Sequence, residues 1–172
     1  MKKLPLSFFN RPALIVAKEL IGCYFCLRMN GVVARYKITE TEAYIGPHDM
    51  ASHASKGRTK RTEVMYGEAG TIYVYFIYGM YHMFNIVTGQ KDFPAAVLLR
   101  GIEGWNGPGK LTKQFGIDKR VNGKLLGTQT GIWIEQPLTS NRIKIKRTAR
   151  VGVSYAGPIW AEKKYRFILL PD

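Results

Sequence analysis

The stretch that most constrains the fold is residues 71–89, TIYVYFIYGMYHMFNIVTG. It is too rich in aromatic and β-branched residues for a helix, and residues of these types favour strands. Gly79 lies near its middle, where a glycine marks a bend. The sequence therefore predicts two strands joined near Gly79. Because side chains alternate along a strand, Tyr73 and Tyr75 are expected to share one face.

Further strands are predicted on both sides of this segment. The turn Asn30-Gly31 indicates an earlier hairpin, which leads into the alternating segment VVARYKITETEAY, residues 32–44. Helical spacing over residues 11–22 predicts a helix with Asn10 as its N-cap. Later elements are expected at AAVLLR (95–100), residues 111–115 (a short helix), GIWIE (131–135) and RIKIK (142–146). The predicted fold class is α+β: a single domain, 1–172, with a mixed, mostly antiparallel sheet and a few surrounding helices.

Charge is the strongest bulk signal. Lys and Arg number 26 against 12 Asp and Glu, so the formal net charge is +14. A basic folded domain most often has an anionic partner, and nucleic acid is the commonest. Ten tyrosines and three tryptophans among these cations suit base stacking. The alternative is that the charge serves only solubility.

The sequence also indicates where the protein is located and in which state its two cysteines are. No apolar run approaches the roughly 20 residues needed to span a bilayer. The opening apolar stretch is interrupted by Asn10, Arg11 and Lys18, so it is expected to be structure rather than a signal peptide. A cytoplasmic protein that is not secreted is expected. Cys23 and Cys26 form a lone CxxC, for which two reduced thiols are favoured over a redox pair or half a zinc site.

Residues 40–53, ETEAYIGPHDMASH, combine several acidic residues with His48 and His53. The histidine spacing matches none of the usual metal patterns, so no metal is expected. Glu42 lies near the end of the predicted strand and shares a face with Tyr44 if the strand stays regular. A carboxylate in this position can activate a water molecule. The alternative is a strand glutamate that pairs with surface cations.

Two further residues favour the catalytic interpretation of Glu42. The first is Arg100, which ends a predicted strand. A pocket with aromatic rings, one carboxylate and one guanidinium suits the hydrolysis of a nucleic-acid component. Tyr78, beside Gly79, is expected to protrude, and an exposed aromatic on a basic protein can wedge into stacked bases.

Five segments, in order along the chain, resemble the alkyladenine (3-methyladenine) DNA glycosylase family. They are ETEAYIGPHDMASHA, GTIYVYFIYGMYHMFNIVT, AAVLLR, GPGKL and ARVGVSYAG. The resemblance runs from about residue 6 to residue 167. It implies a base-excision repair enzyme that flips alkylated or deaminated purines out of double-stranded DNA and hydrolyses the N-glycosidic bond. Because no lysine stands in the position of a Schiff-base nucleophile, a monofunctional enzyme is expected. No cofactor is expected, and the protein is expected to be a monomer.

The resemblance also implies roles for individual residues. Glu42 matches the general base that deprotonates the attacking water, while Arg100 and the backbone carbonyl of Val151 match the other groups that hold this water. Residues 56–61 and 144–150 supply cations that are expected to contact phosphates. A catalytically inactive nucleic-acid-binding domain on the same fold is the main alternative, and a hydrolase of free nucleosides is a third.

The remaining matches concern the damaged base. Tyr44 matches the ring that stacks on one face of the flipped base, and His53 and Tyr75 match the groups on its other face. Asn85 matches a pocket asparagine whose side chain disfavours the exocyclic amino group of guanine. Tyr78 matches the side chain that is inserted into the duplex in place of the extruded nucleotide.

Overall fold

The aromatic segment forms the predicted hairpin. In the computed structural model, which describes residues 1–138 and 143–171, β4 (Ile72–Ile77) pairs antiparallel with β5 (Tyr81–Thr88). Tyr73 and Val74 are both buried, but against different neighbours. Tyr73 belongs to a small cluster with Ala54 and Met65, whereas Val74 belongs to the main core. The hairpin therefore has two covered faces near its base.

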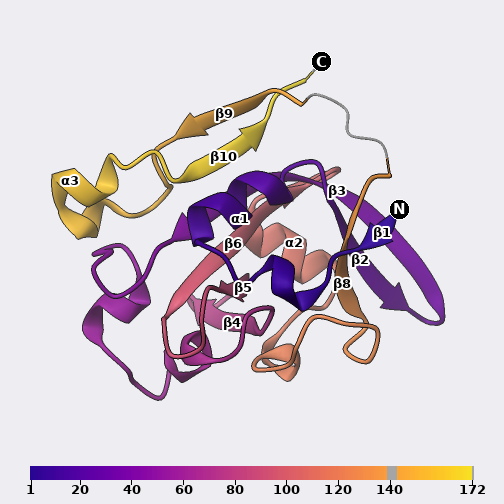
Figure 1. Ribbon diagram of the computed structural model, residues 1–172, viewed down its shortest axis with the longest axis horizontal. Helices are drawn as coiled ribbons and strands as arrows, with labels where there is room; N and C mark the ends of the chain where they lie inside the picture. The colour runs from indigo at the N-terminus through magenta and orange to yellow at the C-terminus, as the bar shows by residue number, and fades with distance from the viewer. Residues whose placement is uncertain (139–142, 172) are drawn as a thin grey trace.

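The hairpin lies at one end of the sheet, and Figure 1 shows the other elements. The remaining strands are β1 (Lys2–Lys3), β2 (Tyr24–Met29), β3 (Val32–Tyr44), β6 (Ala95–Ile102), β7 (Trp105–Asn106), β8 (Ile132–Gln136), β9 (Ile145–Thr148) and β10 (Arg166–Leu169). The helices are α1 (Ala13–Leu20), α2 (Pro108–Gln114) and α3 (Gly157–Ala161). None of the helices in the described ranges has the length and apolar character needed to cross a membrane.

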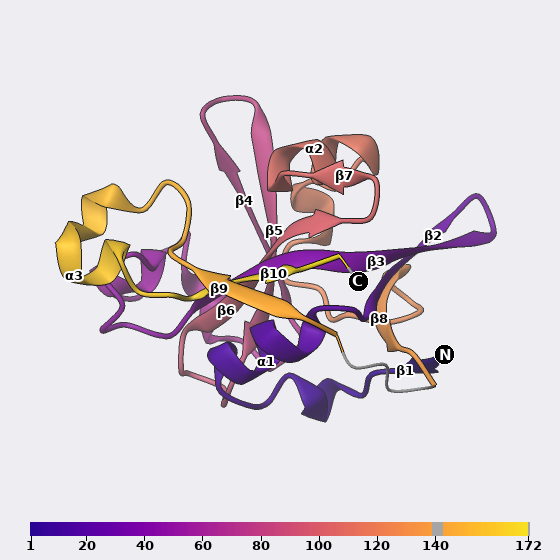
Figure 2. The same cartoon turned by 90° about the horizontal axis from the view of Figure 1, so that it is seen from above.

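The strand order is β1-β8-β2-β3-β6-β5-β4, with β10 paired to β3 and β9, and β7 paired to β6. Every ladder between these strands is antiparallel. Figure 2 shows the β4–β5 hairpin and α2 on one side of the long β3, and α1 on the other. The α+β class with a mostly antiparallel sheet is confirmed.

Helix α1 covers the sheet with its apolar face. Ala13, Val16, Ala17 and Leu20 are buried at the spacing of one helical face. The predicted start was wrong, because the N-cap is Pro12 rather than Asn10. A residue that precedes proline is disfavoured in the helical conformation, so the helix begins only after Pro12.

The carboxyl-terminal third departs most from prediction. Of the expected strand 142–146, the structure has β9 at Ile145–Thr148, and Arg142 lies outside the described residues. Helix α3 and strand β10 were not predicted. Strand β10 places Arg166 opposite Glu42 of β3, which brings the end of the chain next to the predicted catalytic carboxylate.

Candidate active site

Glu42 lies near the end of β3, opposite Leu98 of β6. Its side chain is fully buried, and both oxygens have partners. The backbone N–H of Val151 donates to Oε1 at 2.8 Å, and the hydroxyl of Tyr44 donates to Oε2 at 2.9 Å. Arg100 Nε lies 3.4 Å from Oε1. The structure thus brings together four residues that the sequence predicted for one site.

Two β-bulges aim Arg100 at this carboxylate. The register between β3 and β6 shifts twice, and these shifts leave Thr39 of β3 and Arg100 of β6 without a ladder partner. A bulge bends its strand and redirects a side chain. Arg100 was predicted to end its strand, and this was wrong, because β6 continues to Ile102. The bulge, rather than the end of the strand, is what turns this arginine toward Glu42.

Glu40 holds the arginine in place. Its Oε1 accepts hydrogen bonds from Arg100 Nε at 2.7 Å and from Arg166 Nε at 2.6 Å. The sequence assigned no role to Glu40 or Arg166. Because Glu40 carries a negative charge, it stabilises these two guanidinium groups close together, and one of them, that of Arg100, also lies beside Glu42.

Burial raises the pKa of Glu42 above its ordinary value, and this effect outweighs the opposing effects of its neighbours. Arg100, the Val151 N–H and the Tyr44 hydroxyl all stabilise the ionised form. A carboxylate with a raised pKa binds a proton more tightly, which suits a general base.

A groove of about 970 Å³ opens over this carboxylate. Glu42, Leu98 and Arg100 contribute to it from the sheet, and residues 151–153 line it from the segment before α3. A narrower recess adjoins the groove and shares several of its lining residues. The residues that line the recess include Tyr44, His53, Tyr73, Tyr75, Asn85 and Tyr155. All four residues predicted for the base pocket therefore line one recess, and the sequence missed Tyr73 and Tyr155.

His53 lies against the two tyrosines of β4. Its Nδ1 is 3.2 Å from the hydroxyl of Tyr73, and its ring centroid is 4.6 Å from that of Tyr75. Burial, together with the positive charges of Arg61 and Lys56, lowers the pKa of His53 to about 4. The imidazole is therefore neutral at physiological pH.

Asn85 is fixed within the hairpin. Its Nδ2 donates to the backbone carbonyls of Tyr73 at 3.2 Å and Met83 at 3.1 Å, and the side chain is buried. Both amide hydrogens are thereby used, which fixes the orientation of the side chain. A side chain tied at two points cannot easily move aside.

Tyr78 protrudes at the tip of the β4–β5 hairpin, as predicted. Its side chain is 78% exposed and borders the groove. Its backbone φ is 55°, a conformation that costs free energy for a bulky residue. The hairpin tip projects away from the body of the protein in Figure 2.

Asp49 and Arg150 form an ion pair with no exposed side-chain surface, which the sequence did not predict. Arg150 Nη1 and Nη2 donate to the two carboxylate oxygens of Asp49 at 2.6 and 2.8 Å. Nη1 also donates to the carbonyl of Ala43, and the guanidinium lies 4.8 Å from the ring centroid of Tyr44. The pair anchors the residue before Val151 to the end of β3. Arg150 is therefore not one of the expected phosphate contacts.

Arg58 is a second cation that serves the fold. It donates to Glu63 at 2.6 Å and to Asp92 at 3.1 Å. All four cations in residues 56–61 are exposed on this loop, so Lys56, Lys60 and Arg61 stay candidates for phosphate contacts.

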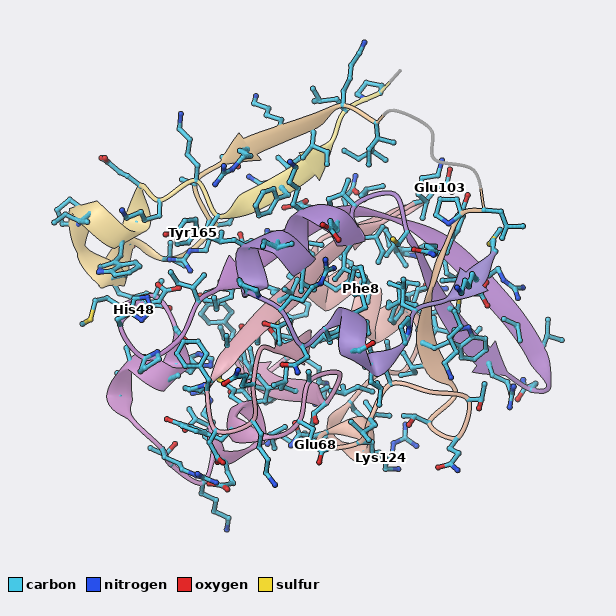
Figure 3. All side chains as sticks on the ribbon, viewed as in Figure 1. Phe8, His48, Glu68, Glu103, Lys124 and Tyr165 are labelled. Carbon is cyan, nitrogen blue, oxygen red and sulfur yellow. The ribbon has the colours of Figure 1, made fainter. Side chains whose placement is uncertain are left out.

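The two histidines of residues 40–53 lie against different neighbours. His48 lies beside α3, with its ring 5.9 Å from that of Trp160 (Figure 3). His53 lies in the recess. Within residues 1–138 and 143–171, no three Cys, His, Asp or Glu side chains gather closely enough to hold a metal ion. Cys23 and Cys26 are buried free thiols, and burial raises their pKa values to about 11 and about 12.

The chain is similar to known proteins of one family. The family model of methylpurine-DNA glycosylase (MPG) matches residues 7–171. A protein of Myxococcus xanthus (strain DK1622) is 43% identical over 96% of this chain and 89% of its own length. Proteins of Legionella pneumophila (strain Corby) and Clostridium perfringens (strain 13 / Type A) are 41% and 40% identical, over 98% and 90% of this chain and 95% and 89% of their own lengths. Each carries the name "Putative 3-methyladenine DNA glycosylase". The chain belongs to the methylpurine-DNA glycosylase family.

Proposed function

We propose that this protein is a monofunctional DNA glycosylase that removes alkylated or deaminated purines from duplex DNA. The expected substrates are of the 3-methyladenine, hypoxanthine and ethenoadenine class. The observation that carries the proposal is the carboxylate of Glu42, which is buried yet borders an open groove, with Arg100 Nε at 3.4 Å and an aromatic recess beside it. Membership of the family supports the reaction class.

In the proposed reaction, the damaged nucleotide swings out of the duplex and its base enters the recess. A water molecule held near Glu42 and Arg100 attacks C1′ of the sugar while the C1′–N9 bond breaks. The bonding electron pair leaves with the base, and a proton of the water passes to Glu42, so that an abasic sugar with a C1′ hydroxyl remains. The ionised carboxylate also stabilises the positive charge that develops on the sugar.

Val151 is proposed to help hold this water through its carbonyl. Its N–H donates to Glu42 at 2.8 Å, so the residue is already fixed next to the base. A carboxylate oxygen can accept two hydrogen bonds, so Glu42 can also accept one from this water.

The recess suits a flat, electron-poor base. Tyr44 is proposed to stack on one face of the base, with His53 and Tyr75 on the other. Rings of this kind attract cationic purines, and the neutral form of His53 avoids repulsion. Asn85, held by two backbone carbonyls, is proposed to exclude the exocyclic amino group of guanine.

The partner is proposed to be double-stranded DNA bound by a monomer, with exposed Lys56, Lys60 and Arg61 near the backbone phosphates. The direct test uses a duplex oligonucleotide with one hypoxanthine, incubated with the protein and then cleaved with alkali at abasic sites. We expect strand scission at the lesion and nowhere else. Binding without scission would instead favour the inactive DNA-binding domain. Hydrolysis of free inosine without scission would favour the nucleoside hydrolase.

The exposed Tyr78 leads to a separate prediction. We expect Tyr78→Ala to lower excision from duplex DNA by about tenfold or more, because the vacated position in the stack would no longer be filled and flipping costs a few kcal/mol. The measurement compares single-turnover rates on the duplex and on the same lesion in a single strand. The single strand should be nearly unaffected. An equal loss on both substrates would contradict a wedge.

A further inference from the structure

Arg61 stands immediately outside the aromatic wall of the recess. It lies on the exposed loop between two short 3-10 turns, His53–Lys56 and Glu63–Tyr66. Its guanidinium carbon is 5.4 Å from the ring centroid of Tyr75. Tyr75 is shared between the groove, which Arg61 also lines, and the recess proposed for the base. A fixed positive charge is therefore one ring away from the proposed position of the base.

The influence of this charge reaches several walls of the recess. Arg61 is the charged group with the largest effect on His53, where it adds to burial in lowering the pKa. It also opposes the rise in pKa that burial causes at Tyr73 and Tyr75. These three side chains come from two different segments, so the positive potential covers the recess rather than one contact.

We propose that Arg61 is a specificity-determining residue whose charge biases the recess toward neutral damaged purines and against cationic ones. The inference rests on the function proposed above and adds a cause of selectivity to it. It does not require that Arg61 touch the base, because a charge acts through space and through the ring that it faces.

The bias follows from charge bookkeeping during the reaction. When the C1′–N9 bond breaks, its electron pair moves onto the base. A neutral purine then departs with developing negative charge, and a cationic purine departs neutral. At every stage the cationic base carries one more positive charge than the neutral base. A nearby guanidinium therefore favours the neutral base by a similar factor whichever step limits the rate.

Tyr75 contributes to the same effect. An aromatic ring attracts a cation through the negative potential of its face. Since Arg61 already lies over this ring, the attraction left for a cationic base is smaller. A neutral base loses nothing by this, so the two effects act in the same direction.

The test compares two lesions within each protein variant. Single-turnover release of hypoxanthine and of 3-methyladenine from duplex DNA is measured at pH 8, where His53 is neutral in every variant because its ordinary pKa is about 6.5. For Arg61→Gln, we expect the ratio of the 3-methyladenine rate to the hypoxanthine rate to rise about fivefold over wild type, an effect moderated by solvent screening. Any phosphate contact of Arg61 affects both lesions and cancels in the ratio.

Two controls separate this inference from a general loss of DNA binding. Arg61→Lys keeps the charge and should keep the ratio within about twofold of wild type. Lys60→Gln removes the same charge from the neighbouring residue and should lower both rates with little change in the ratio. An unchanged ratio in Arg61→Gln, or an equal rise of the ratio in Lys60→Gln, would overturn the inference about Arg61. Excision by the wild-type protein in the same experiment would still support the proposed function. Absence of excision by wild type would refute both.

Discussion

Glu42→Gln is expected to lower the rate of base excision by a factor of about 10² to 10⁴ while affinity for lesion-containing DNA is retained. The amide has the shape of the carboxylate. Its oxygen can accept from the Val151 N–H, and its NH2 group can donate to the Tyr44 hydroxyl, which then accepts instead of donating. It cannot accept a proton from water, and it cannot offset the positive charge that develops on the sugar. The loss should therefore appear in the chemical step rather than in binding.

Single-turnover kinetics and a binding titration with the same hypoxanthine duplex measure the two quantities separately. The wild-type rate should fall as the pH drops through the raised pKa of Glu42, since the protonated acid is not a base. The residual rate of Glu42→Gln should lack this acid limb. Glu19→Gln is the matched control, because this carboxylate pairs with Arg11 on the surface of α1. Excision by Glu42→Gln at the wild-type rate would refute Glu42 as the base.

Loss of folding would not explain the slower excision expected of Glu42→Gln. The pKa of Glu42 is raised in the folded state, so the folded protein is favoured when this group is protonated, and that advantage is lost as the pH rises through the folded pKa. Above this pKa the buried charge therefore lowers stability. The neutral amide should leave the melting temperature unchanged or higher.

The parts of the fold that depend on local pattern were predictable. The β4–β5 hairpin follows from its aromatic and β-branched residues. The turn at Asn30-Gly31 follows from a residue pair that tolerates positive φ, and the φ angles in the structure are 50° and 81°. Strand β10 and helix α3 were not predicted. Strand β10 is only four residues long, and its place is set by pairing with β3 and β9 rather than by its own pattern.

In the site, too, the residues set by local pattern were predictable and those set by long-range pairing were not. Glu42, Tyr44 and Tyr78 could be selected from strand alternation and from a turn. The approach of Arg100 depends on two β-bulges, and a bulge leaves no clear mark on the pattern of one strand, because it is a property of the pair. The supporting contacts of Glu40 with Arg166 and of Asp49 with Arg150 join residues 126 and 101 positions apart. Sequence alone gave each of these charges several equally good partners.

Asp49→Asn is expected to lower the free energy of unfolding by about 3–5 kcal/mol, because it leaves the guanidinium of Arg150 buried without its counter-charge. The carboxylate also accepts the backbone N–H groups of Ile45 and Ala51, so the variant weakens the turn after β3 as well. For a chain of this size, the melting temperature should fall by about 10 °C. Calorimetry and urea unfolding measure both quantities.

Asp118→Asn is the matched control, since Asp118 pairs with Arg120 at 2.9 Å on the surface, where Arg120 is 80% exposed. Its effect should stay below about 1 kcal/mol. The double variant Asp49→Asn/Arg150→Gln should recover part of the lost stability, because it removes the unpaired charge that makes the single variant costly. If Asp49→Asn were no more destabilising than Asp118→Asn, the buried pair would not be what anchors the segment before Val151 to β3. A double variant less stable than Asp49→Asn would show instead that Arg150 stabilises the fold mainly through the carbonyl of Ala43 and the ring of Tyr44.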